Sequence, residues 1–185
     1  MGSICICQSK ANQNSIKTKI VIVGLESSGK TALFEYIRIG NFVQTEPTEG
    51  YNVNFNNKDF LIFDLAGKTP NLWQHYYQNT DGIIFMIDST NKGKLQEVKQ
   101  QLIKLNRDIE FLNIGVLILF NKQDLEHLDF QVLLEECGVE KNLQFQKAWQ
   151  MCSCKTGEGI EEGIKKLVFL IKKQQTTVQN QQQIT

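Results

Sequence analysis

The residues best suited to chemistry lie in a glycine-rich run directly after the first apolar segment, KIVIV (19–23). The run matches the pattern G-x-x-x-x-G-K-[ST], which joins a strand to a helix, and reads Gly24-Leu25-Glu26-Ser27-Ser28-Gly29-Lys30-Thr31. Successive backbone N–H groups and a helix N-terminus form a site for an anion there. The Lys30 ammonium adds a point charge for outer phosphates, and the Thr31 hydroxyl can bind magnesium. The sequence therefore predicts a phosphate-binding loop.

A second polar cluster, Asn121-Lys122-Gln123-Asp124, follows the apolar run GVLILF (115–120). The Asp124 carboxylate can accept hydrogen bonds from N1–H and the exocyclic amine of guanine, whereas adenine offers no such pair. Ser153-Cys154-Lys155 follows the last predicted strand, where a backbone N–H can reach guanine O6. We therefore predict that the bound nucleotide is GTP or GDP. This base-reading cluster argues against a nucleoside kinase.

These clusters sit where short apolar runs end. The apolar runs 19–23, 82–88 and 115–120 alternate with helix-like segments at 30–39, 94–105, 130–136 and 160–171. Further segments of this alternation cover 72–78 and 143–153. Continuous apolar runs that alternate with helices predict an α/β domain, a mostly parallel sheet with helices on both faces. The adjacent runs 51–55 and 60–64 predict a hairpin, and hence one antiparallel edge strand. Ligands of such sheets bind at the carboxyl ends of the strands.

Length and composition limit the function classes. A chain of 185 residues, 41% of them hydrophobic, can bury one sizeable core. Its formal net charge of zero argues against nucleic-acid binding. Five cysteines without a paired zinc-ligand pattern favour a reducing compartment, with the cytosol as the default. We expect a mobile N-terminal segment (1–17), a nucleotide-binding domain (18–172) and a glutamine-rich disordered tail (173–185).

The sequence resembles the Ras superfamily and, within it, the Arf and Arf-like branch. GLESSGKT (24–31), PTEGYNV (47–53), LWQHYYQNTDGIIFMIDS (72–89) and TGEGIEEGIKKL (156–167) carry the likeness, which covers residues 19–171. It implies the P-loop small G-protein fold with a six-stranded sheet. It also implies that Thr48 closes over the γ-phosphate and binds magnesium, that Asp64 holds a magnesium-bound water, and that the Gly67 N–H contacts the γ-phosphate.

The resemblance further implies a monomeric GTP switch. Such a switch works with an exchange factor, a GTPase-activating protein and effector proteins, and the family places it in membrane or vesicle traffic or in ciliary transport. Three aromatic residues, Tyr51, Phe63 and Tyr76, align with an effector-facing patch of the Arf proteins. Aromatic side chains at such strand positions also fit a core, so both interpretations stay open at this point.

Lys68 is the most informative departure from the family, because nearly all relatives carry a glutamine there that orients the attacking water. A lysine ammonium has three donors and no acceptor, so it cannot orient the lone pair of water. No catalytic residue is therefore assigned. The second switch, after Gly67, and the hairpin 51–64 are also shorter than in typical Arf proteins. Two hypotheses follow, a GTPase with slow intrinsic hydrolysis and a GTP-binding scaffold that has lost hydrolysis.

The first residues, Met1-Gly2-Ser3-Ile4-Cys5-Ile6, begin like an N-myristoylation site, although Ile6 replaces the preferred serine or threonine. One myristoyl chain binds a membrane only marginally. Palmitoylation of Cys5 or Cys7 would supply the second anchor. We thus expect a peripheral protein on the cytosolic face of a membrane.

Overall fold

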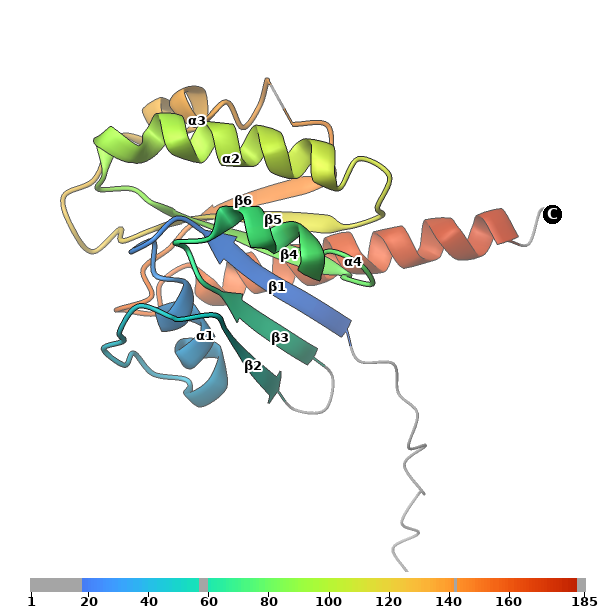
Figure 1. Ribbon diagram of the computed structural model, residues 1–185, viewed down its shortest axis with the longest axis horizontal. Coiled ribbons are helices and arrows are strands. Elements are labelled where there is room, and N and C mark those ends of the chain that lie inside the picture. The colour runs from blue at the N-terminus through green and yellow to red at the C-terminus, as the bar shows by residue number, and fades with distance from the viewer. Residues whose placement is uncertain (1–17, 57–59, 142, 183–185) are drawn as a thin grey trace, which may run out of the picture.

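A six-stranded sheet forms the centre of the molecule (Figure 1). The computed structural model describes residues 18–56, 60–141 and 143–182. The strands are ordered β2-β3-β1-β4-β5-β6. Their bounds are β1 Thr18–Gly24, β2 Tyr51–Asn56, β3 Phe60–Leu65, β4 Gly82–Asp88, β5 Gly115–Asn121 and β6 Lys147–Met151.

The strand directions confirm the fold class predicted from the sequence. The edge strand β2 runs antiparallel to β3, and every other neighbouring pair is parallel. In the β2–β3 pair Asn52 lies opposite Asp64, a register that becomes important at the functional site. The parallel strands end at one edge of the sheet, so the residues that follow them converge.

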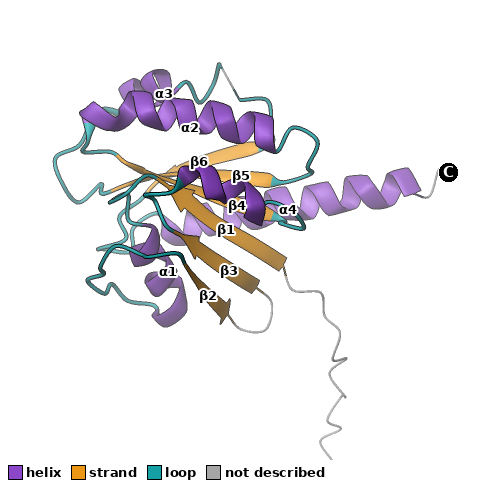
Figure 2. Cartoon of the chain, viewed as in Figure 1, coloured by secondary structure: helices purple, strands orange, loops and turns teal. Residues whose placement is uncertain are grey.

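Helices cover both faces of the sheet (Figure 2). One face carries α2, α3 and a short 3-10 helix, η1, and the other carries α1 and α4. A second 3-10 turn, η2, precedes α2. The bounds are α1 Lys30–Ile39, η1 Pro70–Tyr76, η2 Lys92–Lys94, α2 Leu95–Asp108, α3 Phe130–Cys137 and α4 Ile160–Gln182.

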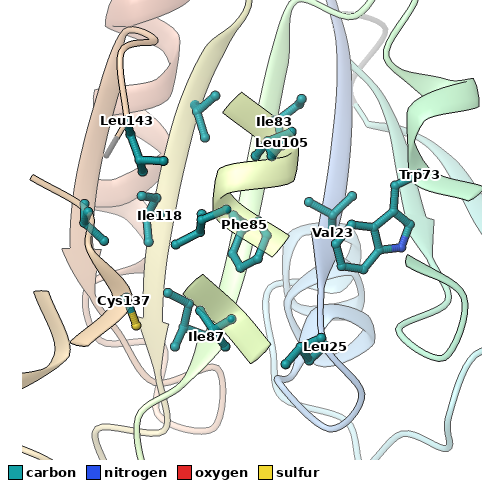
Figure 3. Close-up of a cluster of buried hydrophobic side chains, with 14 of the residues drawn as sticks. Val23, Leu25, Trp73, Ile83, Phe85, Ile87, Leu105, Ile118, Cys137 and Leu143 are labelled. Atoms are coloured by element: carbon teal, nitrogen blue, oxygen red, sulfur yellow. The ribbon is translucent and has the colours of Figure 1, made fainter. Parts of the chain in front are cut away.

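Alternate residues of the central strands build the two cores. Val23, Phe85 and Ile118 point to the α2 and α3 side, where Trp73 of η1 also packs (Figure 3). Their neighbours Ile22 and Ile84 point to the α1 and α4 side. These strand residues are fully or almost fully buried. Burial on both faces explains why the strands read as continuous apolar runs, and it fixes the strand ends that carry the site.

Helix α4 corrects one expectation from the sequence. The glutamine-rich segment from residue 173 was predicted to be disordered, but α4 continues through Gln182 and extends past the sheet (Figure 1). Glutamine has a good helix propensity, and a helix already nucleated by packed residues adds further turns readily. Gln174 is buried at 4% exposure, and its side chain lies near Gly115 at the start of β5. Residues 183–185 and the N-terminal segment 1–17 lie outside the described residues.

Candidate functional site

The phosphate-binding loop joins β1 to α1, as the sequence predicts. Gly29 is the N-cap of α1 and has a φ of 96°, a left-handed conformation that glycine adopts without strain. A Cβ atom there would collide with Nδ2 of Asn121, so no other residue fits. The turn leaves backbone N–H groups at the start of α1 without intrahelical partners, which is the arrangement that binds anions.

Lys30 places its ammonium inside this loop. Lys30 is 5% exposed, and its Nζ donates a hydrogen bond to the Leu25 carbonyl at 3.0 Å. Burial lowers the pKa of Lys30 to about 8, and the Asp64 and Glu26 carboxylates oppose that shift. A phosphate group brought to the loop would favour the charged ammonium and give it a strong acceptor.

Thr31, Thr48 and Asp64 meet beside Lys30. The two threonine hydroxyl oxygens are 2.6 Å apart, and both hydroxyls donate to Oδ2 of Asp64, at 2.9 and 3.0 Å. Oδ1 of Asp64 is buried without a hydrogen-bond partner. Burial raises the pKa of Asp64, although the Thr31, Thr48 and Asn52 hydrogen bonds and Lys30 lower it. Hydroxyl and carboxylate oxygens are the ligands that magnesium prefers, and an orphaned carboxylate oxygen suits a metal-bound water, so the residues fit that ion.

Asn52 belongs to this corner but was missed in the sequence. Its Nδ2 donates to Oδ2 of Asp64 at 3.3 Å, because the antiparallel register places the two residues opposite one another. The hairpin predicted from the runs 51–55 and 60–64 places Asn52 near Asp64, but end-to-end pairing of those runs puts position 52 opposite position 63. The observed register differs by one residue, with Asn56 opposite Phe60, and this shift pairs Asn52 with Asp64.

Asn121 joins the two halves of the site. It is 3% exposed, its Nδ2 donates to the Ser28 carbonyl at 2.9 Å, and its Oδ1 accepts from the Cys154 N–H at 3.0 Å. One amide thus links the phosphate loop, the end of β5 and the loop after β6. The three sequence clusters that were predicted to bind one nucleotide are brought together here.

Asp124 lies beside the loop after β6. Ser153 Oγ donates to Asp124 Oδ1 at 2.6 Å, and Lys155 Nζ is 3.7 Å from Oδ2. The Ser153 hydrogen bond is the main reason that the pKa of Asp124 is lowered, with a smaller contribution from Lys155. The carboxylate therefore stays ionised as an acceptor at neutral pH.

Lys122 has a partner that the sequence did not reveal. Its backbone φ is 69°, and its ammonium lies 2.7 Å from Oδ2 of Asp88 at the end of β4. Oδ1 of Asp88 accepts from Thr90, so the carboxylate is held on both sides. Asp88 thereby orients Lys122. The signal that was available is that Asp88 ends an apolar strand next to β5.

Comparisons with known proteins agree with this geometry. The family model of the ADP-ribosylation factor (Arf) family matches residues 5–171. The chain belongs to the Arf family. Among solved structures it is similar to the Arl6 (BBS3) small GTPase from Trypanosoma brucei, which was solved with the nucleotide analogue GppNp bound. The TM-score is 0.74 and the identity 26%, over 85% of this chain and 99% of that chain. This Arf-family chain is therefore a guanine-nucleotide-binding small GTPase of the switch type.

Lys68 takes a position that the sequence left open. Its ammonium lies 3.5 Å from Oε1 of Glu26 in the phosphate loop, and the two side chains are 63% and 39% exposed. Both residues line a cavity of about 240 Å³. The neighbouring Gly67 packs so closely on the phosphate loop that a Cβ atom would lie 2.6 Å from Glu26 N and 2.7 Å from Lys30 Nζ. The other residues that line this cavity are Ser27, Gly29, Lys30, Thr31, Thr45, Glu46, Pro47 and Thr48.

The three aromatic residues predicted as an effector patch form one cluster. Their ring centroids lie 5.6 Å apart for Tyr51 and Tyr76, 6.0 Å for Phe63 and Tyr76, and 6.2 Å for Tyr51 and Phe63. Tyr51 is 53% exposed, whereas Phe63 and Tyr76 are partly buried against the core. The ammonium of Lys19 contacts the cluster. Its Nζ lies 5.3 Å from the Phe63 ring centroid and donates to the Tyr76 carbonyl at 2.7 Å. The cluster therefore exposes the Tyr51 ring at the surface, while the Phe63 and Tyr76 rings extend the core.

The candidate acylation residues Gly2, Cys5 and Cys7 lie outside the described residues. Within the part of the chain that the structure describes, no helix has the length and apolar character required to cross a bilayer.

Proposed function

We propose that this chain is a magnesium-dependent GTP switch that recruits effector proteins in its GTP state and hydrolyses GTP slowly by itself. The observation that carries the proposal is the position of Lys68, in the glutamine position of the family and paired with Glu26 at the phosphate cavity. The nucleotide residues are those predicted from the sequence. Thr31 and Thr48 are the proposed magnesium ligands, with Asp64 behind them.

Slow hydrolysis follows from the chemistry of the reaction. The oxygen of a water molecule must attack the γ-phosphorus while the bond to the bridging oxygen of GDP breaks, and the water proton passes to phosphate. Positioning that water contributes several kcal/mol in related reactions. The Lys68 ammonium can donate to a phosphate oxygen, but it has no acceptor with which to orient the water. Its ammonium also lies 3.5 Å from the Glu26 carboxylate, which offsets part of its positive charge.

Single-turnover hydrolysis tests the proposal. The protein is loaded with radiolabelled GTP, and phosphate release is followed without partner proteins. We expect Lys68→Gln to hydrolyse GTP about tenfold or more faster than the wild type, since the glutamine amide restores a donor and an acceptor together. Lys165→Gln is the matched control, because Lys165 forms an exposed ion pair with Glu161 on α4, among residues that line a different cavity.

The alternative is a scaffold that binds GTP and does not hydrolyse it. It is favoured if neither the wild type nor Lys68→Gln releases phosphate while both retain bound GTP. A wild-type rate equal to that of glutamine-bearing small GTPases would contradict slow hydrolysis. Binding of neither GTP nor GDP would contradict the whole proposal.

We further propose that acylation holds the protein on the cytosolic face of a membrane, where it acts in membrane traffic or ciliary transport with an exchange factor and a GTPase-activating protein. Gly2 is the proposed myristoylation site, with Cys5 or Cys7 as the second anchor. Two acyl chains are needed because one gives only marginal attachment. Gly2→Ala should move the protein to the soluble fraction of its own cells, and Cys5→Ser with Cys7→Ser should weaken attachment. A wild-type protein found only in the soluble fraction would contradict the anchor.

We propose a monomeric state in solution.

A further inference from the structure

The phosphate cavity carries an unusual balance of charge. Four charged side chains line it, namely Glu26 and Glu46 against Lys30 and Lys68, and the buried Asp64 adjoins Lys30. Phosphate groups prefer a surplus of positive charge, so a balanced lining makes each charge important for how strongly an additional phosphate binds.

The two lysines are not equivalent. Lys30 is buried in the loop and already donates to the Leu25 carbonyl, while Lys68 is largely exposed at the rim. Glu26 acts on both, since it supports the charge of Lys30 and lies 3.5 Å from Lys68. The carboxylate of Glu26 therefore lies at the place where Lys30, Thr31 and Thr48 would receive the outer phosphates of a nucleotide.

Stability does not account for the Glu26 and Lys68 pair. An ion pair exposed to this degree contributes little to folding, because solvent screens it and two long side chains lose freedom. The backbone nonetheless keeps the pair at the cavity, because Gly67 is in contact with the phosphate loop and Lys68 is the next residue along the chain. The pair therefore matters because it changes the charge that the cavity presents to a ligand.

We propose that the Glu26 and Lys68 pair determines the preference between GTP and GDP. Glu26 alone repels a third phosphate more than it repels the two of GDP, because the γ-phosphate adds negative charge at the cavity. Lys68 neutralises Glu26 and donates to the γ-phosphate, so that the triphosphate is tolerated. This inference rests on the proposed function and names the specificity-determining residues of the same site.

Four proteins test it, the wild type, Lys68→Gln, Glu26→Gln and the double variant. The dissociation constants of GDP and of the non-hydrolysable analogue GppNp are measured with magnesium at low and high salt. Lys165→Gln is again the matched control, since it removes a lysine from an exposed pair on α4. GDP binding reports in the same experiment that each variant is folded.

We expect Lys68→Gln to weaken GppNp relative to GDP by about tenfold, the change that corresponds to one partly screened charge interaction. Glu26→Gln should shift the ratio in the opposite direction, and the double variant should return to within about threefold of the wild type. The shifts should shrink at high salt, because the side chains are exposed. Lys68→Arg should retain the wild-type ratio.

An unchanged ratio in both single variants would overturn the inference, and so would an equal loss of GDP and GppNp. A double variant that disfavours GppNp as strongly as Lys68→Gln alone would show that Glu26 does not oppose Lys68, and would also overturn it. In each of these cases the protein still binds guanine nucleotide and the proposed function stands. Failure of the wild type to bind either nucleotide would instead contradict the proposed function.

Discussion

The base-reading end of the site and its phosphate end are built in different ways. At the base end, Asn121 is buried and bonded to two separate loops, and Asp124 is bonded to Ser153. At the phosphate end, Glu26 and Lys68 are exposed side chains that interact through charge across a cavity. Both ends follow strands, because the base-end residues lie at or just after the ends of β5 and β6, and Glu26 and Lys68 lie in the loops after β1 and β3.

The two ends should therefore differ in how readily they tolerate replacement. A buried amide with two partners cannot change type without leaving polar groups unpaired, so the base end tolerates little replacement. Exposed charges tolerate replacement at little cost to folding. The Lys68 and shortened-switch departures lie at the phosphate end, where we expect them to change chemistry rather than stability.

The largest effect on folding stability should come from removing the link between the ends. Asn121→Ala leaves the Ser28 carbonyl and the Cys154 N–H without partners, so we expect the free energy of unfolding to fall by about 2–4 kcal/mol. Nucleotide affinity should fall by more than about tenfold, because the loops lose their common anchor. Denaturant unfolding and nucleotide titration measure both. Asn71→Ala, which removes only an exposed contact with Lys104, is the control and should change neither.

Asp124→Asn tests the base end alone. An asparagine amide has only one acceptor oxygen, so its NH₂ would face one of the two guanine donors, whereas the same NH₂ can donate to the extra carbonyl of xanthine. We expect GDP affinity to fall by about a hundredfold and xanthosine diphosphate to become preferred. Competition binding measures the change. Asp129→Asn is the control, since Asp129 is the N-cap of α3 and asparagine caps equally well. An unchanged preference for guanine would remove Asp124 from the base site.

Magnesium removal tests the phosphate end alone. We expect a chelator to accelerate GDP release by about tenfold or more, because the proposed ion is the largest positive charge available to the phosphates. Selectivity for guanine over adenine nucleotides should stay unchanged, since Asp124 is independent of the ion. Fluorescent-nucleotide release measures the rate, and competition measures selectivity. Equal release rates with and without chelator would place the metal outside the binding mechanism. Parallel loss of selectivity would contradict the separation of the two ends.

The smallest effect on the nucleotide should come from the aromatic cluster. Tyr51→Ala removes an exposed ring with two aromatic neighbours, so we expect a loss of about 1 kcal/mol in the free energy of unfolding. Nucleotide affinity should stay within about twofold of the wild type. Denaturant unfolding and titration with GDP measure these quantities. A large loss of affinity would show that the cluster is coupled to the phosphate end.

The fold and the nucleotide residues were largely predictable because their signals are local. The glycines and Lys30 of the phosphate loop, and Asn121 and Asp124 after an apolar run, each lie in one short segment. Parallel strands then bring such segments to one edge of the sheet. The antiparallel edge strand followed from two adjacent apolar runs, and the structure confirms it.

Contacts between distant segments were not predictable in the same way. The Asn52 and Asp64 hydrogen bond depends on the exact register of β2 against β3, and a one-residue slip would turn Asn52 to the opposite face. The pairing of Lys122 with Asp88 depends on β4 and β5 being neighbours. The helical course of α4 beyond residue 172 contradicts a composition typical of disorder, because packing of its first turns nucleated the helix.

Lys68 illustrates which properties followed from the sequence and which from the tertiary structure. The sequence by itself determined that residue 68 is a lysine, whose ammonium has donors and no acceptor with which to orient a water. Only the tertiary structure decided that this ammonium faces Glu26 across the phosphate cavity. The physical reason is that a side chain's chemistry is fixed by its covalent structure, whereas its partner is fixed by the close contact of Gly67 with a loop far away in the chain.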